Sequence, residues 1–272
     1  MKLYVTDLDG TLLDINAEIS PESAEQLNRL LLEKNITFFT ARSMSVVKKI
    51  FNEVKWKLPC VVNNGAFIVD YSTGNYISEQ YIDEENVKEI IDKAKEMNIS
   101  YIVLCMYQGI EKMIYSDINN EGIRTFIGQR EKLNDKRLLK WDNSLKLSEM
   151  KIFSLQFVDS FSNLSELRDR IRDDCLVTYL DREIYVDGYY YLNVNNKNAT
   201  KEQALQKIIE LLHISLNDVT AFGDQINDLE MLKMCGRGVA VSNANPELKK
   251  GADFVIGSNV EGSVIKFIAN DK

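Results

Sequence analysis

Short apolar segments alternate with amphipathic segments at both ends of this 272-residue chain. Six of them have the β-branched and aromatic content of buried strands: 2–7, 35–41, 60–62, 218–224, 237–241 and 253–257. Ser20 and Pro21 open a helical stretch after the first of these segments, and Thr200 with Gln203 forms a capping box ahead of another. Because regular alternation of strands and helices builds a parallel sheet, the sequence predicts an α/β fold.

The middle of the chain, from about residue 83 to residue 187, has a different pattern. Strand-like segments such as 99–107 and 150–158 lie beside helical segments without strict alternation, and 176–181 with 182–187 looks like a strand pair. We expect an α+β module inserted into the α/β domain. This divides the chain into a core of residues 1–82 and 188–272 and an insertion of residues 83–187.

Composition narrows the classes of function. The 33 basic and 41 acidic residues give a net charge of −8, whereas a general nucleic-acid binder needs a basic face. No apolar run approaches the roughly 20 residues of a membrane-spanning helix, and early charges such as Lys2 argue against a secretory leader. We expect a cytoplasmic monomer or homodimer that binds neither nucleic acid nor membranes. Its cysteines, which have no metal-site spacing, should be reduced: Cys60, Cys105, Cys175 and Cys235.

The chain has a single histidine, His213, at the end of a helical segment with apolar periodicity. A structural or exposed position suits it better than a catalytic one. Mechanisms based on Ser-His-Asp, Cys-His or histidine-bound metals therefore have almost no residues to use. If the chain is an enzyme, carboxylates carry its chemistry.

Asp7 and Asp9 follow the first strand segment two residues apart, so along an extended chain their side chains leave on the same side. Two unit charges about 4 Å apart repel by about 4 kcal/mol at an effective dielectric constant of 20, and a divalent cation is the usual compensation. The alternative is a simple Asp-Gly turn after an edge strand.

A second acidic pair, Asp224 and Asp228, follows another apolar strand segment and begins a helix. Ligands of open α/β sheets bind outside the carboxyl ends of the strands. Since Mg²⁺ prefers oxygen ligands and keeps waters that a phosphate can share, four carboxylates in this position indicate a magnesium site. Helix N-terminal capping is the alternative for this pair.

Two more places offer donors for phosphate oxygens. Thr40, Arg42 and Ser43 end a strand segment with hydroxyl, backbone N–H and guanidinium groups, although a hydroxyl there can equally serve as a helix cap. Lys201 follows the capping Thr200, where its charge opposes the helix dipole. A surface lysine is the alternative for Lys201.

Taken together, these stretches resemble the haloacid dehalogenase superfamily of phosphotransferases, most closely its Cof-type branch of sugar-phosphate phosphatases with a large inserted cap. The resemblance runs through the following segments in order: DLDGTLL from Asp7, TARS from Thr40, NNGA from Asn63, Lys201, GDQIND from Gly223, VSNA from Val241 and ADFVIGSNVEGSV from Ala252. It implies a Rossmann-like parallel-sheet core, with residues 83–187 as an α+β cap that selects the substrate.

The resemblance also implies roles for four catalytic residues. Asp7 would be the nucleophile that attacks phosphorus, and Asp9 would protonate the leaving oxygen and then activate water. Thr40 would hydrogen-bond the transferring phosphoryl group. Lys201 would neutralise charge on Asp7 and on that group.

By the same resemblance, Mg²⁺ would be held by Asp7, the backbone carbonyl of Asp9 and Asp224, with Asp228 binding through water or steadying the site. Further residues of the matching motifs would bind the phosphate group or support the loop around it: Leu8, Thr11, Ala41, Arg42 and Asn227. Two departures from the family pattern stand out. Ala41 replaces a usual glycine, and the run Asn195–Asn198 replaces a loop that contains proline and glycine, although asparagine accepts unusual backbone angles nearly as well.

The expected function is a Mg²⁺-dependent phosphatase that hydrolyses a small phosphorylated metabolite, such as a sugar phosphate, through an aspartyl-phosphate. A phosphomutase of the same superfamily is the first alternative, since it would return the phosphoryl group to a sugar. A non-catalytic module that binds a phosphorylated ligand, or a signalling receiver, is the second. Net release of phosphate separates the first two.

Overall fold

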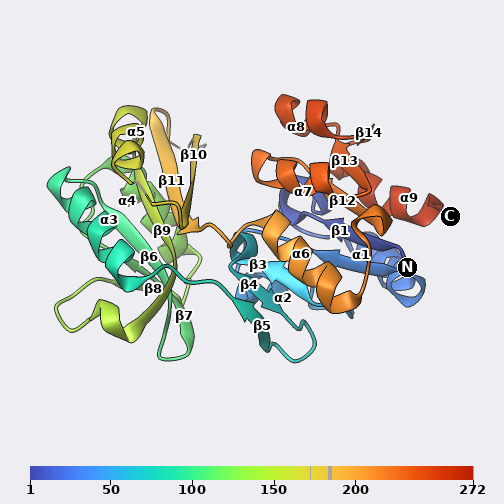
Figure 1. Ribbon diagram of the computed structural model, residues 1–272, viewed down its shortest axis with the longest axis horizontal. Coiled ribbons are helices and arrows are strands. Elements are labelled where there is room, and N and C mark those ends of the chain that lie inside the picture. Colours follow the sequence, from blue (N-terminus) through green and yellow to red (C-terminus); the bar gives the residue numbers. More distant parts are fainter. Residues whose placement is uncertain (172, 183–185, 272) are drawn as a thin grey trace. The chain divides into compact units, whose positions relative to one another are not determined.

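The computed structural model describes residues 1–171, 173–182 and 186–271, which fall into two compact units. The first unit, the core, comprises Met1–Glu79 and Asn198–Lys272, and the second, the cap, comprises Gln80–Lys197 (Figure 1). The sequence-based division at residues 83 and 187 differs most at the second boundary. The difference there is the strand Tyr189–Asn196, which pairs with other strands of the cap.

The core is built on a parallel sheet of β1 (Leu3–Thr6), β2 (Asn35–Phe38), β12 (Val219–Gly223), β13 (Arg237–Val241) and β14 (Phe254–Ile256). The strand order is β14-β13-β12-β1-β2, and every pair is parallel. Strands β1 and β12 are buried along their whole length, as expected for apolar strands inside a parallel sheet. Because these two strands are neighbours, the residues that follow them meet at one edge of the sheet.

The expected strand at residues 60–62 belongs to a separate small sheet. It forms β3 (Cys60–Val62), which pairs antiparallel with β4 (Phe67–Val69), and β4 pairs antiparallel with β5 (Tyr76–Glu79). A single parallel bridge between Phe39 and Val61 connects β3 to the residue that follows β2. The turn between β3 and β4 thereby lies beside the end of β2.

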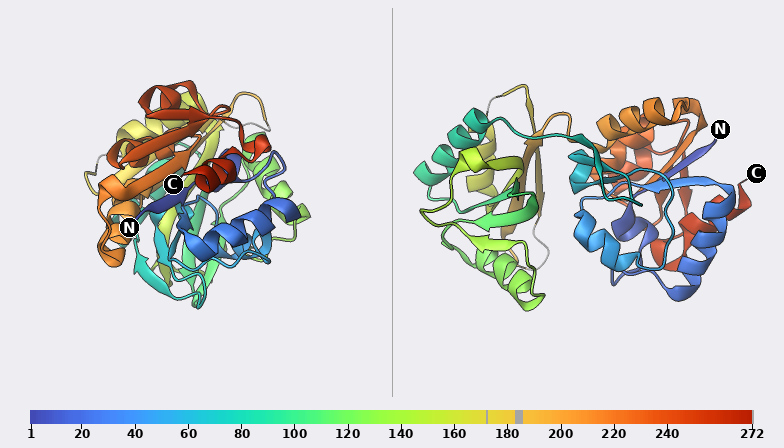
Figure 2. Two further views of the ribbon diagram at one scale, coloured as in Figure 1. Left: turned by 90° about the vertical axis from the view of Figure 1, so that its right-hand side faces the viewer. Right: turned by 90° about the horizontal axis from the view of Figure 1, so that it is seen from below.

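Helices cover both faces of the core sheet: α1 (Pro21–Glu33), α2 (Met44–Ile50), α6 (Lys201–Leu212), α7 (Leu229–Met234), α8 (Pro246–Gly251) and α9 (Ser263–Asn270). Helix α1 packs with α9 and α6 packs with α7, and the two pairs lie on opposite faces of the sheet (Figure 2). Ser20 and Thr200 both cap their helices, since Ser20 Oγ accepts from Ser23 N–H at 3.1 Å and Thr200 Oγ1 accepts from Gln203 N–H at 3.4 Å.

The cap contains a six-stranded sheet of β6 (Tyr101–Tyr107), β7 (Ile110–Tyr115), β8 (Leu138–Lys140), β9 (Met150–Ser160), β10 (Leu176–Arg182) and β11 (Tyr189–Asn196). Its order is β10-β11-β9-β6-β7-β8, antiparallel except for the β7–β8 pair. Helices α3 (Glu84–Glu96) and α5 (Phe161–Arg170) pack on one face of this sheet, and α4 (Glu121–Lys132) packs on part of the other.

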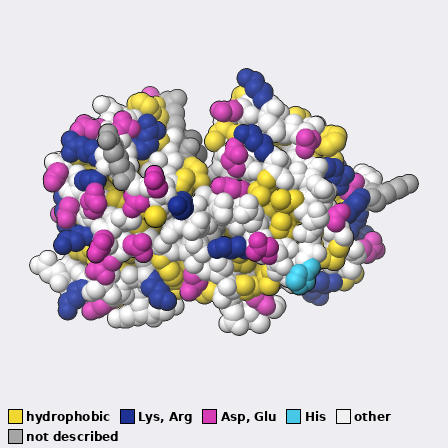
Figure 3. All heavy atoms as spheres, viewed as in Figure 1, with side chains coloured by type: hydrophobic (Ala, Val, Ile, Leu, Met, Phe, Trp, Pro, Cys, Tyr) yellow, Lys and Arg dark blue, Asp and Glu magenta, His cyan; other side chains and the backbone are white. Residues whose placement is uncertain are grey.

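Charged side chains of both signs lie on the face drawn in Figure 3, and most of the cysteines are buried. Lys and Arg side chains are interspersed with Asp and Glu over the face drawn in Figure 3, rather than gathered by sign. All four cysteines carry free thiols, and only Cys175 is exposed. Within the described residues, every helix is too short or too polar to cross a bilayer.

Candidate active site

Asp7 lies directly after β1, where the chain turns through Leu8–Leu12. Its backbone N–H donates to Phe222 O at 2.9 Å, which fixes the start of this loop to β12. Gly10 allows the turn, since its φ is 71° and a Cβ at this position would lie 2.4 Å from Asp224 Oδ2. The loop after β1 and the end of β12 can therefore approach each other only because residue 10 has no side chain.

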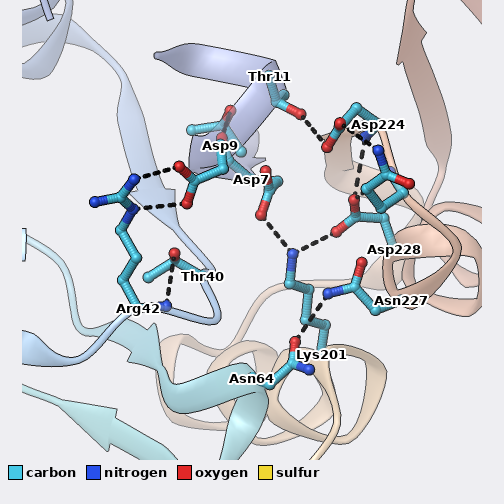
Figure 4. Close-up of polar contacts among 12 residues, drawn as sticks. Asp7, Asp9, Thr11, Thr40, Arg42, Asn64, Lys201, Asp224, Asn227 and Asp228 are labelled. Atoms are coloured by element: carbon cyan, nitrogen blue, oxygen red, sulfur yellow. Dashed lines mark hydrogen bonds and ion pairs between the residues drawn. The ribbon is translucent and has the colours of Figure 1, made fainter. Parts of the chain in front are cut away.

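Three carboxylates gather at this edge of the sheet. Asp7, Asp224 and Asp228 each present one oxygen such that the three oxygens lie within 4.8 Å of one another, and all three residues are buried. The ammonium of Lys201, at the start of α6, lies 2.5 Å from Asp7 Oδ1 and 2.6 Å from Asp228 Oδ1 (Figure 4). Three of the four carboxylates that the sequence predicts to gather therefore meet at one place in the core.

The charges of this cluster do not cancel, because three carboxylates face one ammonium. Burial, followed by the charges of Asp228 and Asp224, holds the pKa of Asp7 well above its usual range despite the opposing effect of Lys201. Burial and the charge of Asp228 raise the pKa of Asp224 to about 6. For Lys201, burial acts to lower the pKa, but the charges of Asp228 and Asp7 outweigh it and hold the pKa above its ordinary value.

These properties fit a divalent cation. The cluster offers buried carboxylate oxygens, the ligands that Mg²⁺ prefers. It also carries more negative than positive charge in a place where unpaired charge is costly, and a bound cation would remove that excess. The residues present are therefore suited to hold such an ion.

Asp228 has both oxygens engaged within the protein. Its Oδ1 accepts from Lys201, and its Oδ2 accepts from the backbone N–H groups of Asp224 at 3.1 Å and Gln225 at 3.2 Å. Asp224 is held in turn by Thr11 Oγ1 at 3.2 Å and by Gln225 Nε2 at 3.1 Å. Asp228 thus positions the lysine and the loop after β12.

The carboxylate of Asp9 lies apart from this cluster. It forms a two-pronged ion pair with Arg42, with Nε–Oδ2 and Nη2–Oδ1 distances of 2.7 and 2.5 Å. Thr40 is fully buried beside this pair, and its Oγ1 accepts from the Arg42 backbone N–H at 3.1 Å. Asp9, from the loop after β1, and Thr40 and Arg42, from the loop after β2, therefore form a second group next to the carboxylates (Figure 4).

Sequence reasoning assigned no role to Asn64, which the structure places at the site. Asn227 Nδ2 donates to Asn64 Oδ1 at 2.9 Å, which joins the loop after β12 to the turn between β3 and β4. The available signal was the Asn63-Asn64-Gly65 run, because asparagine and glycine favour the positive φ angles of 50°, 60° and 103° found there. At Gly65 a Cβ would lie 2.4 Å from Thr200 O, so this turn packs directly against the start of α6.

Of the other residues expected at the site, two have side chains that contact it and two do not. Thr11 and Asn227 contact the site, through Asp224 and Asn64 respectively. Leu8 is fully buried, so its side chain serves packing, while its carbonyl accepts from Leu13 N–H at 2.9 Å. Ala41 is exposed on the loop between Thr40 and Arg42.

Residues 4–268 match the profile of the haloacid dehalogenase-like hydrolases, and the chain belongs to this family. Its expected resemblance to this superfamily and its expected fold class are thereby confirmed. Phosphatase YwpJ of Bacillus subtilis is 25% identical over 285 residues, which span 97% of each chain. A second B. subtilis protein, the 5-amino-6-(5-phospho-D-ribitylamino)uracil phosphatase YwtE, is 27% identical over 291 residues, or 98% of this chain and 97% of that one.

A solved structure agrees over the whole chain. The crystal structure of TM0651 from Thermotoga maritima has a TM-score of 0.79 and 26% identity, with 100% of this chain and 97% of that chain covered. Both core segments and the inserted cap are therefore common to the two chains.

Proposed function

We propose that this hydrolase is a Mg²⁺-dependent phosphatase that removes the phosphoryl group from a small phosphorylated metabolite by way of phosphorylated Asp7. Membership of a family whose matching members include named phosphatases supports the reaction class. The observation that carries the mechanism is the contact of Asp7 with Lys201 inside a buried carboxylate cluster. A carboxylate that approaches an anionic phosphate is repelled unless nearby cations offset the negative charge of both groups. Lys201 is one such cation, and the excess negative charge of the three carboxylates would be offset by a bound metal ion.

In the first step a carboxylate oxygen of Asp7 attacks phosphorus, and the bond from phosphorus to the leaving oxygen breaks. Asp9, in its protonated form, gives its proton to that oxygen, so that the product leaves as an alcohol. Thr40 and Arg42 donate hydrogen bonds to the phosphoryl oxygens, and Lys201 keeps its positive charge beside Asp7 throughout. Dividing the reaction in this way replaces one high barrier by two lower ones.

In the second step Asp9 takes a proton from water, and the water oxygen attacks phosphorus. The bond from phosphorus to Asp7 breaks, which releases phosphate and restores the carboxylate. The Asp9 carboxylate pairs with Arg42, and to serve the reaction its side chain would turn from Arg42 to the leaving group and then to water.

Asp7, the Asp9 carbonyl and Asp224 would hold Mg²⁺, while Asp228 fixes Lys201 and the loop after β12. When bound, the ion supplies positive charge that offsets the repulsion between carboxylate and phosphate oxygens. The cap would select the leaving group, as expected for an insertion of this kind. A sugar phosphate or a similar small molecule suits the role, and we keep a cytoplasmic monomer or homodimer without nucleic-acid partners as a prediction.

The test is net release of inorganic phosphate from p-nitrophenyl phosphate and from a panel of phosphorylated metabolites, with Mg²⁺ and with EDTA. Release should stop with EDTA and return with Mg²⁺, and Asp7→Asn should lower kcat on the order of 10³-fold or more at unchanged circular dichroism. Transfer of the phosphoryl group to a sugar without net release would indicate a phosphomutase instead. Full activity of Asp7→Asn would overturn the mechanism.

A further inference from the structure

Two of the motifs that resemble the family contribute no residue to the proposed mechanism. VSNA, from Val241, forms the loop after β13, and SNVEG, from Ser258, leads into α9. Each contains one asparagine, Asn243 in the first and Asn259 in the second. Both asparagines form hydrogen bonds to the loop after β1, the loop that begins with Asp7.

Asn243 holds the middle of the loop after β1. Its Nδ2 donates to the Gly10 carbonyl at 2.8 Å, and its Oδ1 accepts from the Asn259 backbone N–H at 3.0 Å. Because Gly10 has no side chain to restrict its backbone, its carbonyl can turn easily unless it is held. The bond from Asn243 fixes the peptide plane that leads from Gly10 to Thr11. Thr11 Oγ1 then donates to Asp224, one of the three clustered carboxylates.

Asn259 holds the end of the same loop. Its Nδ2 donates to the Leu13 carbonyl at 2.8 Å, and the Leu13 N–H donates to the Leu8 carbonyl at 2.9 Å, which closes the loop. The backbone N–H of Asn259 also orients the amide of Asn243, since it occupies the amide oxygen and leaves Nδ2 for Gly10. The two asparagines are therefore joined to each other and to two points of one loop.

The loop after β13 also reaches the loop after β12. The Asn245 N–H, two residues beyond Asn243, donates to the Asp224 carbonyl at 2.8 Å. The loop after β13 thus binds backbone carbonyls on both sides of the acidic cluster, at Gly10 and at Asp224. Because these bonds end on backbone carbonyls, they can set the spacing of the carboxylates without competing with a cation for carboxylate oxygens.

We propose that Asn243 and Asn259 are positioning residues, which hold the loop after β1 in the conformation that binds Mg²⁺ and presents Asp7 to the phosphoryl group. This inference rests on the proposed phosphatase function. Loss of a residue that orients metal ligands typically lowers metal affinity or activity by about 10- to 100-fold. A merely structural link would instead lower stability and leave both properties unchanged.

The chain offers a matched control in Asn28 of α1. Its Nδ2 donates to the Glu53 carbonyl and its Oδ1 accepts from the Lys55 N–H, both at 2.9 Å. Asn28 therefore makes the same pair of bonds as Asn243, but it joins α1 to the segment after α2, and neither contributes a residue to the site. Asn28→Leu and Asn243→Leu should lower the urea midpoint to similar extents, and only Asn243→Leu should affect the site.

The first experiment needs neither metal nor substrate. Amide hydrogen exchange at Leu13, whose N–H closes the loop after β1, is followed by NMR in the full-length protein. Exchange should be about tenfold faster in Asn243→Leu and in Asn259→Leu than in Asn28→Leu, because the loop opens more often. Exchange in both variants at the rate of Asn28→Leu would overturn the proposal, whatever the activity of the enzyme.

The second experiment measures Mg²⁺ binding by isothermal titration calorimetry in the absence of substrate. Asn243→Leu should raise the Kd for Mg²⁺ about tenfold or more, because the loop that carries Asp7 is no longer held. Asn28→Leu should bind Mg²⁺ as the wild type does. Equal Kd values for the wild type and Asn243→Leu would contradict the proposal.

The third experiment measures phosphate release from p-nitrophenyl phosphate at saturating Mg²⁺. In Asn243→Leu, kcat should fall about tenfold because Asp7 and Asp9 are less well placed. KM should change less than about threefold, since the proposed phosphate donors lie on the loop after β2. An unchanged kcat would contradict the proposal. If the wild type released no phosphate from any substrate, the proposed function would fail, whereas exchange at Leu13 would still decide whether the asparagines hold the loop.

Discussion

The ammonium of Lys201 lies 2.5 Å from Asp7 Oδ1, in a place where the lysine side chain is 1% exposed and the aspartate side chain 8%. The two residues are 194 positions apart in the sequence, and their contact joins the loop after β1 to the start of α6. The same ammonium also holds Asp228 at 2.6 Å. Lys201 is thus the counter-charge of a buried acidic cluster as well as a proposed catalytic group.

Replacing Lys201 by methionine should therefore destabilise the protein strongly. The change leaves buried carboxylates without their cation, and breaking such a pair costs about 3–5 kcal/mol. Urea denaturation at pH 7 without Mg²⁺ measures the loss. Lys207→Met, on the same helix, removes only a bond of 3.2 Å to Ser78 Oγ and should cost about 1 kcal/mol. Equal losses of unfolding free energy in Lys201→Met and Lys207→Met would show that the buried contacts of Lys201 contribute no more to stability than the hydrogen bond of Lys207 does.

Arg42 should matter for activity more than for stability. Its pair with Asp9 is partly exposed, with side-chain exposures of 26% and 47%, so its contribution to folding should be about 1 kcal/mol or less. Arg42→Met should nevertheless lower kcat/KM by roughly 10²-fold, because a donor to the phosphoryl group and the support of Asp9 are both lost. Arg42→Lys should restore only part of this, since lysine cannot form the two-pronged contact. Activity of Arg42→Met within a factor of two of wild type would be inconsistent with both roles.

Asp224 links stability to pH and to metal. Its pKa is raised from 3.8 to about 6 in the folded protein, so the folded state holds this proton more tightly than the unfolded chain does. The contribution of this carboxyl to stability is therefore present below about pH 4 and is lost as pH rises through about 6. Asparagine does not titrate, so metal-free Asp224→Asn should not show this loss. The free energy of unfolding of the variant should therefore rise relative to that of the wild type between pH 4 and pH 7.

The same carboxyl predicts how Mg²⁺ acts. Because a ligand carboxyl must be deprotonated to bind metal, Mg²⁺ should raise the Tm of the wild type more at pH 7 than at pH 5. The effect should be much smaller in Asp224→Asn at both values. Thermal denaturation with and without Mg²⁺ measures this, and an equal rise in Tm for wild type and variant would exclude Asp224 as a ligand.

Gly10 offers a test of the geometry of the loop after β1. Gly10→Ala combines a φ of 71° with a Cβ that would lie 2.4 Å from Asp224 Oδ2, whereas Gly74→Ala meets a φ of 76° with no atom within 4 Å. The second variant should cost about 1–2 kcal/mol from backbone strain alone. The first should cost more and should weaken Mg²⁺ binding. Similar losses, with metal binding intact, would contradict the close approach of Gly10 to Asp224.

Much of the core follows from the sequence for physical reasons. Strands such as β1 and β12 are buried and mostly apolar, and each is followed directly by an aspartate, Asp7 or Asp224, so both their existence and their ends are visible. Strand β11 was missed, because its asparagines oppose strand formation, and the run from Asn195 was interpreted as a loop. Only pairing with β9 and β10 makes it a strand. The segment 182–187, expected as a strand, lies partly outside the described residues.

The site was predictable in its parts but not in its assembly. Asp7, Asp224 and Asp228 stand out as acidic residues after apolar strands, and the order of strands in a parallel sheet brings such positions to one edge. Lys201 had only a weak local signal, its positive charge at a helix start where it opposes the helix dipole, and its specific role came from the resemblance. The contacts of Asn64 with Asn227 and of Arg42 with Asp9 join separate loops. Residue spacing along the sequence does not predict which side chains of different loops will meet.

The central claim is that Asp7 carries the phosphoryl group during turnover. Borohydride added during turnover reduces an aspartyl phosphate to homoserine, and peptide mass spectrometry then identifies the modified residue. Our account predicts homoserine at position 7 when substrate and Mg²⁺ are both present, and unmodified Asp7 when either is omitted. Continued phosphate release with Asp7 unmodified, or modification at another carboxylate, would contradict the account.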